Sequence, residues 1–189
     1  MRWYENKSGR LPVYGLNQSA TEKDKPSPIG NFYLLNQDNA GSGTEKWNGK
    51  IVVVNFFFTH CSGVCPKMTG NLIKVQEAYK NDTGIIINSL TVDPESDSAS
   101  QLKIYARRYG IQSTKWQLLT GDKKEIYRLA RNEFKVLATD GDGGAGDFIH
   151  SEKIVLVDTQ KRIRGYYDGT DINEMKQLIK DILKLKNEN

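Results

Sequence analysis

The sequence is short of cysteine, histidine and long apolar runs. In 189 residues it has 2 Cys, 2 His and 5 Pro. The most apolar stretch, Ile51 to Phe58, is interrupted by Asn55. Nothing approaches the roughly 18 apolar residues of a membrane span, and no signal-peptide core opens the chain. We therefore expect a soluble chain.

The cysteine shortage excludes two classes of protein. Two cysteines cannot form the dense disulfide framework of a small secreted scaffold, nor a four-ligand zinc site by themselves. The chain does not need such staples, because 38% hydrophobic residues in 189 supply enough side chains for one packed core. No period of 20–50 residues repeats, which excludes a solenoid.

A concentrated positive charge is also missing. The formal net charge is +4, from 27 Lys and Arg against 23 Asp and Glu. The densest lysine cluster, near the C-terminus, is interleaved with acidic residues on one expected helix face: Lys176, Lys180, Lys184 and Lys186 with Glu174, Asp181 and Glu188. No basic stripe with stacking aromatics accompanies the charge, so we interpret it as a solvated surface and expect no nucleic-acid partner.

The order of patterns predicts an α/β domain. Residues 1–28 are rich in Gly and Pro without periodicity and read as an irregular arm or linker, and residues 29–189 form the domain. A short strand is expected at Asn31 to Leu35, followed by a polar loop to about Gly49.

Strands and helices then alternate. Continuous β-branched and aromatic runs at Ile51 to Phe58 and Gly84 to Val92 indicate strands buried on both faces. Three helices are expected through Met68–Tyr79, Leu102–Tyr109 (ended by Gly110) and Ile126–Ala130. A strand is expected at Trp116–Leu119, and a hairpin of Ile154–Val157 with Ile163–Tyr167. The last helix is expected to begin with a capping pair, Asp171 and Glu174, and to bury Ile172, Met175, Leu178, Ile179, Ile182 and Leu183. This order predicts a mixed central sheet with helices on both faces, ending in a hairpin and a helix.

The two cysteines, Cys61 and Cys65, lie between a strand and a helix. Pro66 suits the first helical position, which places Cys65 at the helix N-terminus and Cys61 in the preceding turn. Unpaired backbone N–H groups and the helix dipole lower a thiol pKa there. The pair can therefore close a disulfide or hold a metal ion between two thiolates.

The two histidines, His60 and His150, differ in how well their positions suit a metal ligand. His60 precedes Cys61 directly, and we interpret it as structural or modulating. His150 follows a Gly-rich loop, Asp140 to Asp147, whose spacing does not match a calcium-binding EF-hand loop. The glycines would instead give the chain the freedom to bring His150 to the cysteines or away from them. If the strand from Ile154 lies beside Ile51–Phe58, His150 reaches the cysteine end of the sheet. Two thiolates and one imidazole suit Cu(I), and also Cu(II) with a fourth oxygen ligand.

Asp93, in Thr91-Val92-Asp93-Pro94, is expected at the same end of the sheet. It could orient a ligand or face a partner, and a plain turn role before Pro94 is as good an interpretation.

These residues resemble the Sco/SenC family of copper-delivery proteins for cytochrome c oxidase assembly. The matching segments are Phe57 to Pro66, Thr91 to Pro94, and His150-Ser151 ahead of Ile154 to Asp158, and the resemblance covers roughly residues 29–185. It implies a thioredoxin-like fold and copper ligands at Cys61, Cys65 and His150. Family members are normally tethered by an N-terminal membrane helix or lipid. We find neither pattern here and expect residues 2–28 to be the remains of the linker to such a tether.

Two hypotheses of function follow. In the first, the protein is a metallochaperone, not an enzyme, that delivers one copper ion, Cu(I) or Cu(II), to the oxidase subunit holding the dinuclear copper site. In the second, it is a thiol–disulfide oxidoreductase in which Cys61 and Cys65 are the redox pair. Only the first needs His150. A copper donor protein or a thiol reductant is a further expected partner, and the resemblance implies an extracytoplasmic place on the periplasmic face of a bacterial membrane.

Overall fold

The computed structural model describes residues 9–14, 27–136 and 151–188. Within these ranges, seven strands form one mixed sheet in the order β2-β1-β5-β4-β3-β6-β7. The strands are β1 (Tyr33–Asn36), β2 (Gly41–Gly43), β3 (Ile51–Phe57), β4 (Ile85–Thr91), β5 (Trp116–Thr120), β6 (Lys153–Val157) and β7 (Ile163–Asp168). The helices are α1 (Val64–Ala78), α2 (Ala99–Tyr109), α3 (Lys123–Arg128) and α4 (Ile172–Glu188), with short turns of helix η1 (Thr44–Trp47) and η2 (Leu129–Glu133).

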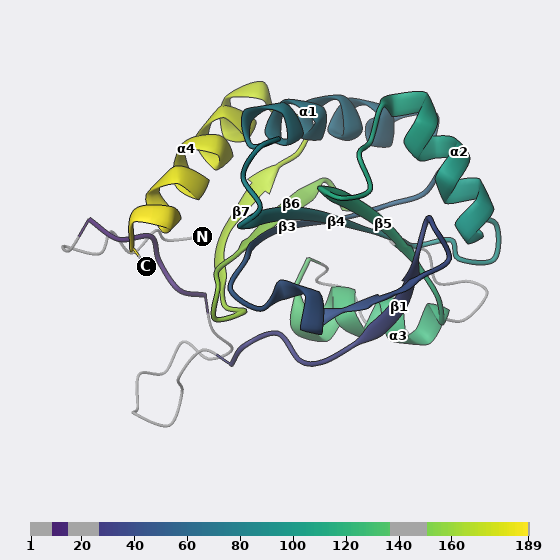
Figure 1. The fold of residues 1–189 in the computed structure, drawn as a ribbon, viewed down its shortest axis with the longest axis horizontal. Helices are drawn as coiled ribbons and strands as arrows, with labels where there is room; N and C mark the ends of the chain where they lie inside the picture. The colour runs from purple at the N-terminus through teal and green to yellow at the C-terminus, as the bar shows by residue number, and fades with distance from the viewer. Residues whose placement is uncertain (1–8, 15–26, 137–150, 189) are drawn as a thin grey trace.

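The sheet is covered on both faces. Helices α1, α2 and α4 lie on one face and α3 on the other, as Figure 1 shows. Each face has its own apolar core: Met68, Leu102 and Leu178 pack on the first, and Trp47, Ile126 and Phe134 on the second. The predicted α/β class and the two covered faces are confirmed.

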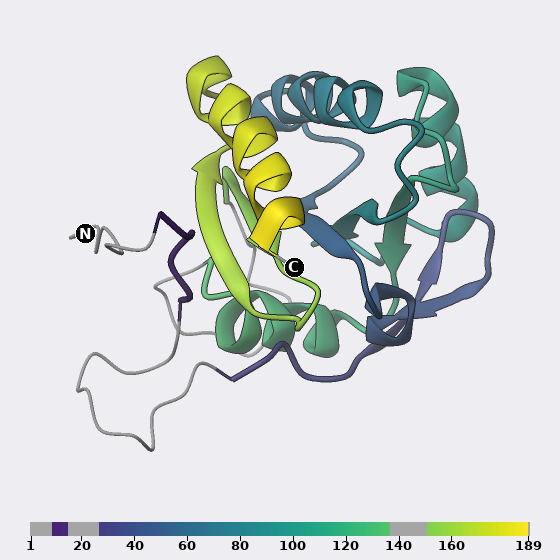
Figure 2. The same ribbon diagram turned by 60° about the vertical axis from the view of Figure 1, so that its left-hand side comes forward.

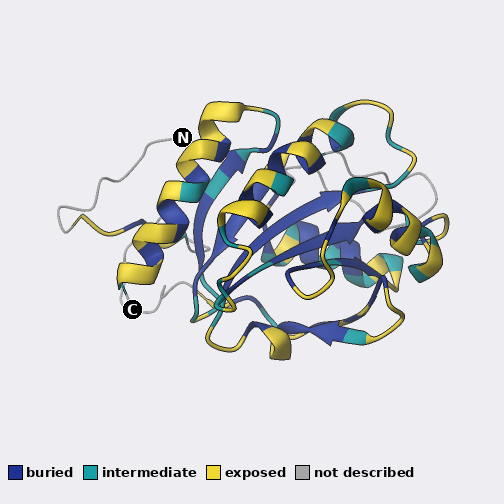
Figure 3. Cartoon of the chain, turned by 45° about the horizontal axis from the view of Figure 1, so that its top comes forward, coloured by how far each residue is buried: buried dark blue, intermediate teal, exposed yellow. Residues whose placement is uncertain are grey.

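Strand β3 is the central strand that leads to the cysteines. It pairs in parallel with β4 and antiparallel with β6, and all seven of its residues are buried. Alternate side chains face opposite cores, Val53 toward α1 and Val52 toward α3. In Figure 3 the strands beneath the helices are mostly dark blue, the colour of buried residues.

Three details differ from the sequence expectations. The polar segment before Gly49 is not all loop, since it contains β2 and η1, which have no apolar alternation to signal them. In α4, Ile172 and Leu183 are exposed, while Leu185 is buried, three residues beyond Ile182. Asp171 does cap α4 through Asn173 N–H, but Glu174 accepts from Asp168 N–H instead of closing a capping box.

The segment of residues 9–14 lies against the far edge of the sheet. Tyr14 pairs with Ile163 of β7, and the buried Arg164 side chain donates to the Leu11 and Pro12 carbonyls. Arg164 also donates to Glu188 at the end of α4, so one guanidinium joins the arm, the sheet and the last helix. Figure 2 shows residues 9–14, in dark purple, beside β7. The domain boundary at residue 28 stays a prediction.

Candidate redox and metal centre

The cysteine pair lies where β3 ends and α1 begins. Cys61 is half-buried in the connecting turn, and Cys65 is the second residue of α1, with 4% of its surface exposed. The helix begins two residues earlier than predicted, because Gly63 is its N-cap and Val64 its first residue. Pro66 is therefore the third helical residue, where a missing N–H still costs no intrahelical hydrogen bond.

The turn stabilises a thiolate at Cys61. The Cys65 N–H points to the Cys61 sulfur at 3.5 Å. Burial raises the pKa of Cys61, but hydrogen bonds from the Cys65 thiol and from the N–H groups of Cys65, Gly63 and Val64 outweigh it, and the net pKa is lowered. The contribution of the N–H groups is the helix N-terminal effect that the sequence predicted.

Cys65 behaves in the opposite way, which corrects the expectation that both thiols become acidic. Burial, the hydrogen bond to Cys61, and the negative charges of Cys61 and Asp97 raise its pKa to about 12, although Phe58 N–H opposes them. Cys61 is therefore the more acidic thiol of the pair, and the Cys65 S–H is the donor that stabilises the Cys61 thiolate when it forms.

A buried carboxylate, Asp97, which the sequence interpretation missed, fixes the start of the turn. Its side chain has no exposed surface and accepts hydrogen bonds from Thr59 N–H at 3.0 Å and from the Thr59 hydroxyl at 2.5 Å. It also accepts from the Thr91 hydroxyl at 2.5 Å. The available signal was its position: Asp97 directly precedes the N-cap of α2, in the segment that follows β4 at the cysteine end of the sheet.

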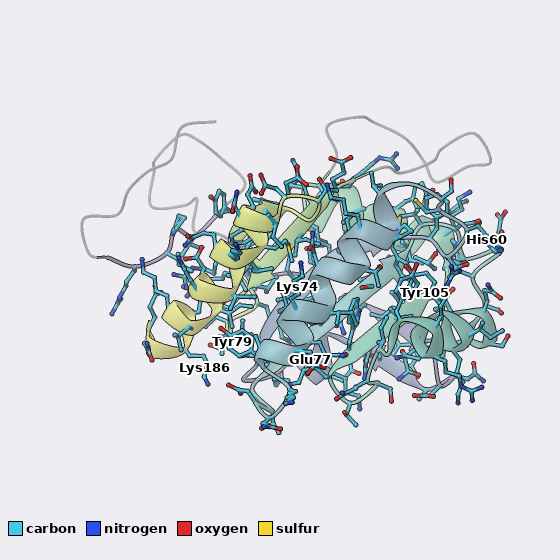
Figure 4. All side chains as sticks on the ribbon, turned by 90° about the horizontal axis from the view of Figure 1, so that it is seen from above. His60, Lys74, Glu77, Tyr79, Tyr105 and Lys186 are labelled. Carbon is cyan, nitrogen blue, oxygen red and sulfur yellow. The ribbon has the colours of Figure 1, made fainter. Side chains whose placement is uncertain are left out.

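His60 and Asp93 lie at the same end of the sheet. The His60 ring is 64% exposed, with Nδ1 3.2 Å from the Thr59 hydroxyl and 4.0 Å from Asp97. In Figure 4, His60 lies beyond one end of α1, and Tyr79 and Lys186 lie near the other. Asp93 forms a turn, since its carbonyl accepts from Ser96 N–H and Asp97 N–H, which supports the plain turn interpretation.

His150 and the loop from Asp140 to Asp147 lie outside the described residues. The predicted pairing of the strand from Ile154 with Ile51–Phe58 is present, because β6 pairs with β3 and Ile154 lies opposite Asn55. The start of β6 therefore lies at the cysteine end of the sheet. Ser151 and Val64 line one cavity of about 650 Å³. Ser151 therefore lies near the start of α1.

Two kinds of feature are absent from residues 9–14, 27–136 and 151–188. No group of three or more His, Cys, Asp or Glu side chains is arranged there to bind a metal ion. No helix in the same ranges has the length and apolar character needed to cross a membrane. The predicted three-ligand set depends on His150.

Sequence and fold comparisons decide the family. The SCO1/SenC family model matches residues 20–187. The chain belongs to the SCO1/SenC family. The SCO1 protein homolog of Bacillus subtilis (strain 168) is 30% identical to this family member over 153 residues, which cover 80% of this chain and 79% of the homolog.

Two solved structures share the fold. One is BsSco, a member of the Sco family of cytochrome c oxidase assembly proteins in which a disulfide switch was identified, with 28% identity, a TM-score of 0.73, and coverage of 86% of this chain and 95% of that one. The other is Bradyrhizobium japonicum ScoI with copper bound, with 23% identity, a TM-score of 0.67, and coverage of 84% and 99%. At that identity the second likeness shows the fold alone.

Proposed function

We propose that this SCO1/SenC family member binds one copper ion through Cys61, Cys65 and His150 and delivers it to the copper-bearing subunit of cytochrome c oxidase, outside the cytoplasm. The observation that carries the proposal is the hydrogen-bonded cysteine pair on the turn between β3 and α1. Membership of a family that includes an oxidase assembly protein, and a fold shared with a copper-bound Sco protein, support it.

The donor chemistry fits copper as a cargo. Thiolate sulfur is a soft ligand that selects Cu(I), and the N–H groups at the start of α1 stabilise the negative charge of the sulfurs. Cys65 must release its proton when copper binds, since a thiol with a pKa of about 12 is protonated at neutral pH. Copper binding should therefore release protons, and affinity should rise with pH.

The position of β6 supports the histidine ligand. The start of β6 lies beside the end of β3, and Ser151, which precedes β6, lines the same cavity as Val64 of α1. An imidazole would add a neutral third ligand to two thiolates and would favour Cu(II) in particular.

A copper titration of the reduced protein tests the proposal. We expect one Cu(I) per chain, a loss of that binding in Cys61→Ser and Cys65→Ser, and a larger loss for Cu(II) than for Cu(I) in His150→Ala. His60→Ala is the matched control, because the exposed His60 ring is directly beside Cys61 and should leave both stoichiometries unchanged. If His150→Ala binds both oxidation states as the wild type does, His150 is not a ligand.

A second function, thiol–disulfide exchange, is favoured by the unequal pKa values of the two cysteines. The Cys61 thiolate would attack a partner's disulfide to form a mixed disulfide, and Cys65 would then displace the partner as a dithiol, leaving a Cys61–Cys65 disulfide. The disulfide switch of BsSco supports this alternative. Thiol–disulfide exchange would be the main function if His150→Ala retains the exchange and the wild type binds no copper.

A further inference from the structure

The buried Asp97 carboxylate joins two loops at the cysteine end of the sheet. On one side it receives both hydrogen-bond donors of Thr59, two residues before Cys61. On the other it receives the Thr91 hydroxyl, which in turn accepts from Asp93 N–H at 3.1 Å. The Asp97 N–H donates to the Asp93 carbonyl at 2.9 Å. The cysteine turn is thus tied through one side chain to the end of β4.

The chemistry of this site calls for a carboxylate. Three donors point at two oxygen atoms, and an ionised carboxylate is the side chain that only accepts hydrogen bonds. Asparagine has the same shape but removes the charge, and its NH₂ group can no longer accept from the Thr59 hydroxyl, which would have to accept from the amide instead. Hydrogen bonds to a charged group are roughly twice as strong as neutral ones, so this tie is weaker in the asparagine variant.

We propose that Asp97 is a positioning residue for the Cys61–Cys65 pair: by fixing Thr59, it holds the turn in the shape that keeps the two sulfurs within reach of each other. The inference rests on the proposed function, because it concerns the same pair of sulfurs. Its consequence is a high effective concentration of one thiol toward the other, which favours the intramolecular disulfide.

The equilibrium with glutathione measures that effective concentration. The reduced protein and glutathione disulfide give the protein disulfide and two glutathione thiols, so the bonds, electrons and protons balance. We expect Asp97→Asn to lower the equilibrium constant about tenfold, the scale on which a charge-assisted hydrogen bond differs from a neutral one. Circular dichroism and thermal unfolding of each variant show whether both redox forms are folded.

Asp158→Asn is the matched control. Asp158 is as deeply buried, at 2% exposure, and accepts from Arg162 and Arg164, but it follows Val157 at the opposite end of β3 from the cysteines. It should lower the stability of the fold without changing the glutathione equilibrium. An equal change in both variants would mean that global stability, and not the turn, sets the equilibrium, and would overturn the inference.

Thr59 provides a second test that does not depend on the folding of the Asp97 variant. Thr59→Val removes the hydroxyl that donates to Asp97 but keeps the backbone N–H bond, and should lower the equilibrium constant severalfold. Thr59→Ser keeps the hydroxyl and should restore the wild-type value. If Asp97→Asn and Thr59→Val both have the equilibrium constant of the wild type, the inference is overturned and the proposed function stands. If the wild-type protein itself forms no disulfide and binds no copper, the proposed function is overturned as well.

Discussion

At the scale of single residues, the two thiols of one motif have opposite acidities. Cys61 sits where N–H groups converge on its sulfur, and Cys65, four residues on, faces the core. Spacing and the expected helix start predicted the first environment. They could not predict the second, because burial of the Cys65 side chain depends on how α1 packs on the sheet.

This difference predicts the pH dependence of alkylation. In the wild type, iodoacetamide should modify Cys61 first, with an apparent pKa below the ordinary thiol value of about 8.5. Cys65→Ala removes the S–H donor and should raise the pKa of Cys61, while Cys65→Ser keeps a donor and should raise it less. The rate of alkylation against pH, with the modified residue identified by mass spectrometry, is the measurement. Alkylation of Cys65 in Cys61→Ala at the rate of an ordinary thiol would contradict this assignment.

At the scale of elements, most strands and helices were predictable because their patterns are local. The run Ile51–Phe57 is apolar on both faces, and Gly110 ends α2 in the left-handed region, with φ of 69°. Asn55, the one polar residue in that run, was not explained by the sequence. In the fold its Oδ1 accepts from Ser89, which accepts from the Trp116 indole, so three strands share a buried polar chain.

Two glycines should respond in opposite ways to alanine. Gly110→Ala places a side chain at positive φ and should destabilise the protein by about 1 kcal/mol. Gly70 is exposed within α1, with open space around the position of a Cβ atom, so Gly70→Ala should stabilise by up to about 1 kcal/mol. Urea unfolding of both variants measures the difference, and changes of the same sign would contradict the prediction.

At the scale of the whole molecule, the contacts that close the fold join residues far apart in sequence. Arg164 connects Leu11, Asp158 and Glu188, and no local pattern indicates that these residues meet. The charged residues near the C-terminus looked like a solvated face, yet Asp181 is buried and accepts from the Tyr167 hydroxyl. Charge patterns in a sequence do not show which carboxylate finds a buried partner.

The Arg164 junction predicts how stability depends on pH. Burial raises the pKa of Glu188. The hydrogen bond from Leu11 N–H and the Arg164 guanidinium together lower it by more than burial raises it, so the net pKa is below the ordinary value. A lowered pKa in the folded state gives stability that is fully present above the ordinary glutamate pKa, about 4.3, and is lost as pH falls through the folded value.

Glu188→Gln removes that stability. At pH 7 the variant should be about 1–3 kcal/mol less stable than the wild type, and the gap should shrink below about pH 4. Chemical unfolding from pH 3 to 8 measures it. A gap that stays constant over this range would show that Glu188 does not titrate against Arg164.

The pairing of Tyr14 with Ile163 has a consequence for solubility. Strand β7 is the last in the sheet order, and a strand at the end of a sheet offers its backbone groups as a template on which another chain can add. Residues 9–14 cover part of the open side of β7. The buried Arg164 holds them there through hydrogen bonds to the Leu11 and Pro12 carbonyls, since a single bridge, Tyr14 to Ile163, pairs them with the strand. We therefore expect residues 9–14 to limit self-association, and their removal to leave the open side of β7 available to another chain.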